Sequence, residues 1–271
     1  MQIVLDLLAE HDVRATFFVG GEVAREYPEV VREIVAGGHE IGSHGQTHTP
    51  LFDLTPASFE AELERSREAI EACSGVTPQG FRAPNFSVTR ETSWAFEALA
   101  DSGYRYDSSV FPAWTPLYGV RDAPTFPYSV DVDRPFEDPD TTTRTDLVEV
   151  PLLVLRRPLR LPLAGGFYGR LLPVEAFRYG LWRLNRRGRP GVLYFHPWEF
   201  NPEVPTGEPR LRERFVSFHG IDTLEAKLDR LLEAVSFGPI RDVLAAESLL
   251  GPTGEPSGSV DATPSEKTTK L

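Results

Sequence analysis

The chain has 271 residues and a formal net charge of −12, from 40 acidic and 28 basic side chains. Lysine occurs only at Lys227, Lys267 and Lys270, so nearly all of the positive charge is arginine. An acidic surface repels phosphate, which argues against nucleic acid as a partner. No apolar run reaches about 18 residues, so we expect no transmembrane segment. An acidic, lysine-poor surface also predicts halophile-like behaviour, because salt screens repulsion between like charges.

The hydrophobic fraction of 41% is sufficient for a buried core, and the length allows one large α/β domain, which we expect over residues 1–250. Glycine, proline, serine and threonine dominate from Gly251 on, which predicts a disordered tail over residues 251–271. Residues 1–6 lack the basic flank of a secretion signal. The lone Cys73 excludes an internal disulfide and favours a reducing compartment, so the expected location is cytoplasmic.

Short apolar runs alternate with amphipathic runs through the first part of the chain. In order, we expect an uncapped helix from residue 1, strands at 13–19, 39–42, 79–82 and 104–107, and helices from Pro28 to Gly37, from Thr55 to about Cys73, and from Thr89 to before Gly103. A strand normally precedes the first helix of a β-then-α fold. The sequence therefore predicts a fold whose first strand is absent.

The second part begins with residues 108–146, whose proline, aspartate and threonine content predicts a long irregular loop. Further expected elements are strands at 147–155 and 191–195, a helix at 173–186, a helix from a capping box at Asp222 and Glu225 through Ala234, and a strand–helix pair at 236–247. Repeated β-then-α units predict a parallel sheet with helices outside it.

Four polar residues follow expected strands at the end where ligands of such folds collect. They are His44 after the strand at 39–42, Arg82 at the end of 79–82, Asp107 at the end of 104–107, and His196 after 191–195. One such coincidence carries little weight, whereas four together predict a shared site.

His44 and His48 are the strongest pattern, since three of the six histidines fall within ten positions. Imidazoles four residues apart can turn toward one point, and neutral imidazole is a common zinc ligand. Catalytic zinc usually takes three protein ligands, so a third has to come from elsewhere. The structural alternative, a solvated or hydrogen-bonded pair, is favoured for an isolated H-x-x-x-H pattern.

The remaining patterns are individually weaker. Arg82, followed by a rigid turn at Pro84, can hold its guanidinium against a carboxylate, or form an ordinary surface ion pair. His196 can be partly buried and tuned, or simply bond a backbone carbonyl. Asp107 can orient His196, or bond its own turn. Gly165 and Gly166 permit close backbone approach to a ligand, although a plain turn is favoured.

Together these segments resemble the polysaccharide deacetylase family, the NodB homology domain of carbohydrate esterase family four. The resemblance runs from about Leu5 to Leu244, and is to the branch with an extra C-terminal segment found near exopolysaccharide genes. The matching segments are residues 15–19, 38–44, 47–48, 81–84, 104–109 and 196–199. The fold that this implies is a distorted (β/α)7-type barrel, here incomplete because its first strand is absent.

The resemblance also implies an activity: removal of N-acetyl groups from an N-acetylated polysaccharide or oligosaccharide, with a divalent metal that is usually zinc. The implied roles are metal binding for His44 and His48, general acid for His196, orientation of the catalytic base for Arg82, tuning of His196 for Asp107, and substrate binding for Tyr194, Trp198 and Pro84.

The sequence departs from the family at one point. The family's first motif is an acidic cluster that supplies the catalytic base and the third metal ligand, and it belongs upstream of residues 15–18. Asp6 and Glu10 lie on the expected first helix and are not assigned that role. We expect the true start to lie upstream or the product to be truncated, and the chain as given to be poorly active. Edges left unpaired by a missing strand predict marginal stability.

Two alternatives to a metal-dependent deacetylase stay open. One is a catalytically silent carbohydrate-binding protein, which the missing carboxylates would explain. The other is an amide hydrolase of the same fold that acts on a small cyclic amide.

Overall fold

The computed structural model describes residues 1–115, 118–137, 146–155, 160–201, 203 and 218–250. The predicted tail at 251–271 and part of the predicted loop at 108–146 lie outside these residues. Within the described part of the chain, no helix is long and apolar enough to cross a membrane.

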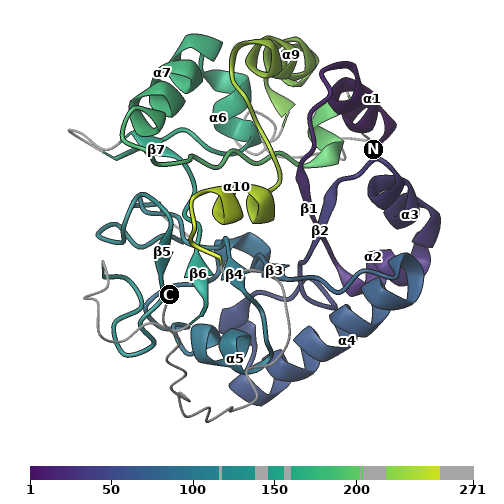
Figure 1. The fold of residues 1–271 in the computed structure, drawn as a ribbon, viewed down its shortest axis with the longest axis vertical. Helices are drawn as coiled ribbons and strands as arrows, with labels where there is room; N and C mark the ends of the chain where they lie inside the picture. The colour runs from purple at the N-terminus through teal and green to yellow at the C-terminus, as the bar shows by residue number, and fades with distance from the viewer. Residues whose placement is uncertain (116–117, 138–145, 156–159, 202, 204–217, 251–271) are drawn as a thin grey trace, which may run out of the picture.

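A six-stranded sheet forms the centre of the molecule, in the order β1-β2-β3-β4-β6-β5 (Figure 1). The strands are β1 (Thr16–Val19), β2 (Glu40–Ser43), β3 (Gly80–Phe81), β4 (Tyr106–Asp107), β5 (Tyr128–Ser129) and β6 (Val148–Glu149). All neighbours pair in parallel except β5, which adds an antiparallel edge. A small hairpin pairs β7 (Val154–Leu155) with β8 (Leu161–Pro162).

The register of the parallel strands aligns their carboxyl ends. The paired residues at these ends are, in order across the sheet, Val19, Ser43, Phe81, Asp107 and Glu149. The residues that come next in the chain are therefore brought to the same edge, as predicted from the sequence.

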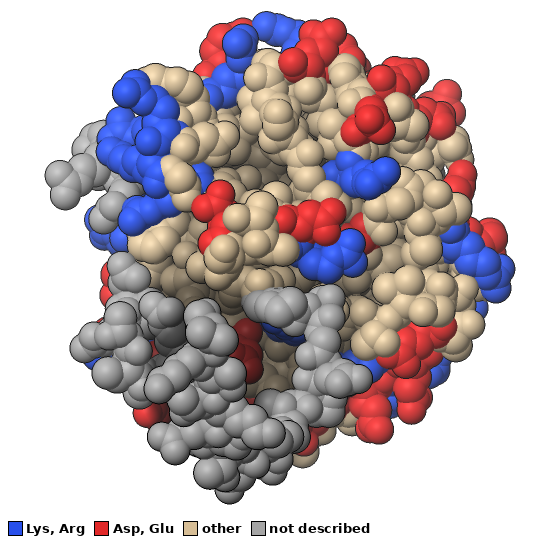
Figure 2. Space-filling view, viewed as in Figure 1, with Lys and Arg blue, Asp and Glu red and all other residues tan. Residues whose placement is uncertain are grey.

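Helices surround this sheet (Figure 1). They are α1 (Gln2–Glu10), α2 (Gly21–Glu26), α3 (Pro28–Ala36), α4 (Pro56–Ser74), α5 (Ala95–Asp101), α6 (Gly166–Leu171), α7 (Val174–Asn185), α9 (Leu224–Ala234) and α10 (Ile240–Ala246). Short 3₁₀ turns are η1 (Leu51–Asp53), η2 (Pro84–Phe86), η3 (Pro197–Phe200) and η4 (Ile221–Thr223). Figure 2 shows acidic side chains on the side of α3 and α4, whereas arginines gather where α7 lies.

Local sequence explains the clearest boundaries. Helix α4 begins after Thr55, whose side chain accepts a hydrogen bond from the backbone N–H of Ser58, and it ends at Gly75 in the left-handed conformation, with φ of 70°. Helix α1 has no side-chain cap, as predicted, and is held by its buried leucines Leu7 and Leu8. Most of its stability therefore comes from packing.

The first and last parts of the chain share their cores. Leu7 and Leu8 of α1 cluster with Leu224 and Leu228 of α9. Leu244 of α10 packs with buried residues of β4 and β6. Buried Glu40 anchors α10 further, because its Oε2 accepts hydrogen bonds from the Thr16 hydroxyl (2.6 Å) and from the backbone N–H of Arg241 (3.1 Å). These contacts fit the prediction of one domain, which stays a prediction.

Several predicted elements are wrong. The predicted strand at 191–195 makes only a single parallel bridge, between Val192 and Leu152. The strand expected before α10 is absent from the described residues. The capping box at Asp222 does not form, because Asp222 lies in η4 and α9 begins after Thr223 without a side-chain cap. The helix expected from Thr89 begins at Ala95.

The predicted fold class is confirmed as a mainly parallel α/β fold. The strand order does not close on itself among the described residues, so a closed barrel is not formed there. Helix α1 is the first described element, and β1 pairs only with β2 within the described sheet. The other edge of β1 lies beside a cavity.

Candidate active site

A cavity of about 750 Å³ lies between β1 and residues 190–196. Its polar lining includes His44, His48, Arg82, Tyr194 and His196, so it brings together five of the eight predicted site residues. Its apolar lining includes residues of β1, α9 and α10. The other three predicted residues, Asp107, Pro84 and Trp198, do not line it.

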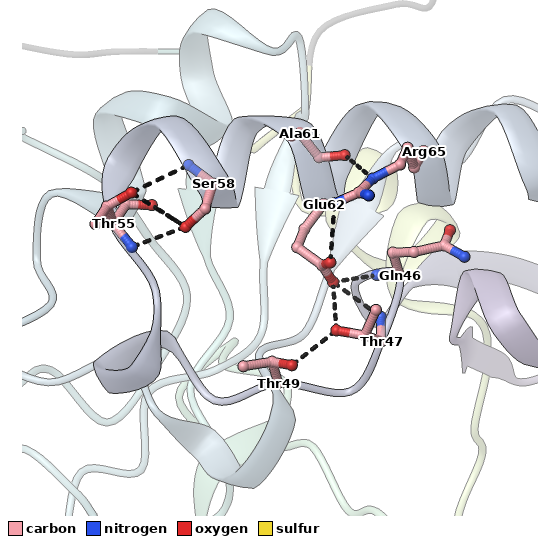
Figure 3. Close-up of polar contacts among 8 residues, drawn as sticks. All are labelled: Gln46, Thr47, Thr49, Thr55, Ser58, Ala61, Glu62 and Arg65. Atoms are coloured by element: carbon pink, nitrogen blue, oxygen red, sulfur yellow. Dashed lines mark hydrogen bonds and ion pairs between the residues drawn. The ribbon is translucent and has the colours of Figure 1, made fainter.

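The loop that carries both metal-binding candidates is held by Glu62 of α4 (Figure 3). One buried carboxylate oxygen of Glu62 accepts the backbone N–H groups of Gln46 (2.9 Å) and Thr47 (2.8 Å) and the Thr47 hydroxyl (3.1 Å). Hydrogen bonds to a charged acceptor are stronger than neutral ones. Glu62 therefore fixes the backbone between His44 and His48.

His44 and His48 lie together. Their ring centroids are 4.9 Å apart with planes at 72°. The Nδ1–H of His44 donates to the Arg82 carbonyl oxygen over 2.6 Å, which leaves the Nε2 lone pair available to a cation. Burial lowers the pKa of His44 to about 3; the carbonyl opposes this, while the charges of His48, Arg82 and His196 add to it. His44 is therefore neutral near pH 7, the form that binds metals.

Arg82 is buried beside this pair. Its Nε donates to the Ser108 carbonyl (2.8 Å) and its Nη2 to the Ser108 hydroxyl (2.7 Å). Its guanidinium carbon lies 4.3 Å from the Phe18 ring centroid, within range of a cation–π interaction. Burial lowers the pKa of Arg82 to about 10, so the group stays charged near neutral pH. Its predicted role in orienting a catalytic base stays a prediction.

Asp107 lies below Arg82 and does not face the cavity. Its Oδ1 accepts the Ser109 hydroxyl, and its register partner on β6 is the buried Glu149, whose Oε1 accepts the backbone N–H of Val110 over 3.0 Å. Burial raises the pKa of Asp107 to about 6, and burial together with the charge of Asp107 raises the pKa of Glu149 well above its ordinary value. These contacts give no support to the predicted role of Asp107 beside His196.

His196 lines the same cavity from the segment 190–196, which we call the second wall; the loop of His44 and His48 is the first wall. Its side chain is 51% exposed, and its Nδ1 lies 3.4 Å from Oε2 of the buried Glu199. The Tyr194 ring meets it edge-on at 5.6 Å, and the Trp198 ring stacks on it at 5.9 Å. Trp198 is therefore near the site although it does not line the cavity.

Pro84 is buried and does not line the cavity, and its predicted substrate-binding role stays a prediction. The turn that it begins places its neighbours Asn85 and Phe86 in the cavity wall. Both have positive φ, of 55° and 51°, and His48 has a φ of 57°. Such backbone conformations are costly for residues other than glycine and often occur at functional sites.

The fit of a metal to these residues is partial. Two neutral imidazoles match two positions of a zinc site. Within the described part of the chain, no group of three or more histidine, cysteine, aspartate or glutamate side chains lies close enough to hold a metal. The described residues therefore do not complete such a site by themselves.

Glu62, Glu149 and Glu199 were missed by the sequence reasoning. Glu62 reaches the loop between His44 and His48 from α4, whereas Glu149 lies beside Asp107 outside the cavity lining, and no local pattern marks either residue. Glu199 had a signal, since it lies three residues after His196, the spacing of a capping box.

A mainly parallel α/β fold with histidines at the carboxyl ends of its strands defines the class of this protein. Residues 1–106 match the family model for polysaccharide deacetylase, and residues 108–245 match a domain of unknown function, DUF3473. The chain therefore has a polysaccharide deacetylase domain in its N-terminal part, followed by a DUF3473 segment.

Curated relatives support this assignment. The chain is 44% identical over 100 residues to a chitooligosaccharide deacetylase of Bradyrhizobium sp. (strain ANU 289), covering 36% of this chain and 43% of the relative. It is 31% identical over 152 residues to a peptidoglycan deacetylase of Helicobacter pylori, covering 55% of this chain and 50% of the relative. The chain thus spans half or less of the length of these relatives.

Solved structures agree on the fold. A crystal structure from Mycobacterium smegmatis, named as a polysaccharide deacetylase, superposes with a TM-score of 0.60 at 23% identity, covering 96% of this chain and 81% of that one. An allantoinase superposes with a TM-score of 0.58 at 16% identity, covering 90% and 70%. At these identities the similarity concerns the fold alone.

Proposed function

We propose that this chain is the core of a metal-dependent hydrolase that removes N-acetyl groups from an acetylated polysaccharide or oligosaccharide. The observation that supports this most is the cavity shared by His44, His48 and His196. These side chains come from opposite ends of the chain, and their charges are close enough to influence the pKa of His44. Residues 1–106 also match the deacetylase model.

The residues suit the chemistry of amide cleavage. An amide is a poor electrophile with a poor leaving group, so it needs activation of the carbonyl and a proton for the departing nitrogen. A divalent metal, when bound, polarises the carbonyl and acidifies its water. In this proposal His196 protonates the departing nitrogen. Arg82 contributes a fixed positive charge, and Tyr194 walls the pocket beside Phe86, with ring centroids 4.6 Å apart.

Zinc is the metal proposed for His44 and His48, because imidazole nitrogen is one of its preferred ligands. None of the described residues is assigned as the third zinc ligand or as the catalytic base. Acetate release from N-acetylated chitooligosaccharides with zinc tests the function. We compare the chain as given with a version extended through the upstream reading frame. We expect the extended protein to release acetate and His196→Ala to abolish this release. An extended protein that releases no acetate would contradict the proposal.

A second candidate is a catalytically silent carbohydrate-binding protein. The observation that favours it is the missing third metal ligand in the described part of the chain. Binding of chitooligosaccharides, measured by calorimetry, without acetate release from either version would support this candidate over the first.

A further inference from the structure

Glu199 is tied to His196 by contacts in both directions. Its Oε2 accepts the backbone N–H of His196 over 2.8 Å and lies 3.4 Å from the His196 Nδ1. The backbone N–H of Glu199 donates to the backbone carbonyl oxygen of His196 over 3.0 Å, at the start of η3. The two side chains are thus held relative to each other by a short rigid turn.

A buried arginine fixes the carboxylate from the other side. Arg170 of α6 forms an ion pair with Oε1 of Glu199, and both side chains are almost fully buried, at 2% and 3% exposed. Arg170 also donates to the carbonyl of His219 (3.1 Å). Burial raises the pKa of Glu199, but the hydrogen bonds and charges of His196 and Arg170 lower it more, so Glu199 is ionised.

The Gly165–Gly166 turn makes room for this arrangement. A Cβ on Gly166 would lie 1.7 Å from Oε1 of Glu199, and a Cβ on Gly165 would lie 2.5 Å from the hydroxyl oxygen of Tyr194. The groups that approach these glycines closely are therefore the side chains of Glu199 and Tyr194 of the same chain. The Gly165–Gly166 turn, Arg170 and Glu199 thus form one packed group next to His196.

We propose that Glu199, held by Arg170, is the positioning residue of His196. It engages Nδ1 of the imidazole and so leaves Nε2 as the nitrogen available to substrate. This rests on the proposed function for its purpose: His196 gives its Nε2 proton to the departing nitrogen, while the Nδ1 proton stays on the ring and is accepted by Glu199. Asp107, the residue predicted for this place, accepts the Ser109 hydroxyl and does not line the cavity.

The test is NMR spectroscopy of the full chain with ¹⁵N-labelled histidine at acid pH, where the ring is protonated. We expect a slowly exchanging, low-field Nδ1–H signal, assigned to His196 by its loss in His196→Gln. Glu199→Gln, which keeps the shape and removes the charge, is expected to lose this signal. Glu175→Gln is the matched control, because Glu175 is exposed and paired with Arg230 on the surface; it is expected to keep the signal.

Two results would overturn the inference: a wild-type protein without the signal, or a folded Glu199→Gln protein that retains it. The wild-type spectrum decides even if Glu199→Gln fails to fold. Acetate release by the extended protein separates this inference from the proposed function. The signal without acetate release supports this inference and contradicts the function, whereas acetate release without the signal overturns this inference alone.

Discussion

The two walls of the cavity hold histidines in opposite ways. On the first wall, His44 donates its Nδ1 proton to a neutral backbone carbonyl, and burial lowers its pKa to about 3. On the second, His196 is half exposed and lies beside an ionised, arginine-paired carboxylate. A neutral imidazole can bind a cation, whereas an imidazole beside a carboxylate can hold and transfer a proton. The two imidazoles thus differ in their partners, and the partner favours a different role for each: cation binding for His44 and proton transfer for His196.

The largest expected effect is on catalysis. In a version of the protein that releases acetate, His196→Ala should lower kcat by about 10²-fold or more, because positioned proton transfer contributes this much. Its zinc affinity should stay unchanged. Steady-state acetate release and a zinc titration measure the two effects. A loss of zinc affinity in His196→Ala as large as its loss of kcat would contradict the separate roles of the two walls.

The first wall should depend on Glu62. Glu62→Gln weakens hydrogen bonds to a charged acceptor, each worth about 1.5–3 kcal/mol, so we expect a loss of about 2 kcal/mol in the free energy of unfolding. Zinc affinity should also fall, because the loop between His44 and His48 loosens. Urea denaturation measures the first effect. Glu64→Gln, on an exposed position of the same helix, is the control and should change neither.

The carboxyl pair below Arg82 predicts a pH dependence. Burial raises the pKa of Glu149 above its ordinary 4.5, so its contribution to stability is present below that pH and is lost as pH rises toward the folded-state pKa. Relative to Glu149→Gln, the wild type should lose about 1.4 kcal/mol of unfolding free energy per pH unit above pH 5. Urea denaturation at pH 5 and pH 6 measures this. A difference that stays constant or grows would contradict a raised pKa of Glu149.

The smallest effect concerns the surface as a whole. With a net charge of −12, the melting temperature should rise between low and molar salt, because repulsion is screened. The rise should be the same in Glu62→Gln and in the wild type, since Glu62 is buried and adds little to the surface charge. Calorimetry in sodium chloride measures it. A melting temperature that does not rise would remove the halophile-like interpretation.

The sequence was sufficient to predict that His44 and Arg82 lie close together, because their positions depend only on the strands that precede them. His44 and Arg82 follow strands whose carboxyl ends are aligned by parallel pairing, so their proximity required only the strand assignments. His196 lines the same cavity, although the strand expected before it consists of one bridge at Val192. The fold class followed from the same alternation of strands and helices.

What the sequence did not predict depends on long-range packing. Arg170 and Glu199 meet across 29 positions, and Glu62 reaches a loop 15 positions earlier. Asp107 was assigned to His196 because it ends a strand, but its buried carboxylate accepts the Ser109 hydroxyl and is paired in register with Glu149 of the neighbouring strand. Pairings of this kind are set by which strands and helices become neighbours, and no local spacing encodes them.

The most direct test of the central claim is a zinc competition titration of the wild type, His44→Ala, His48→Ala and His196→Ala. The account predicts weaker zinc binding in both variants of the first wall and unchanged binding in His196→Ala. Unchanged zinc binding in His44→Ala and His48→Ala would contradict it.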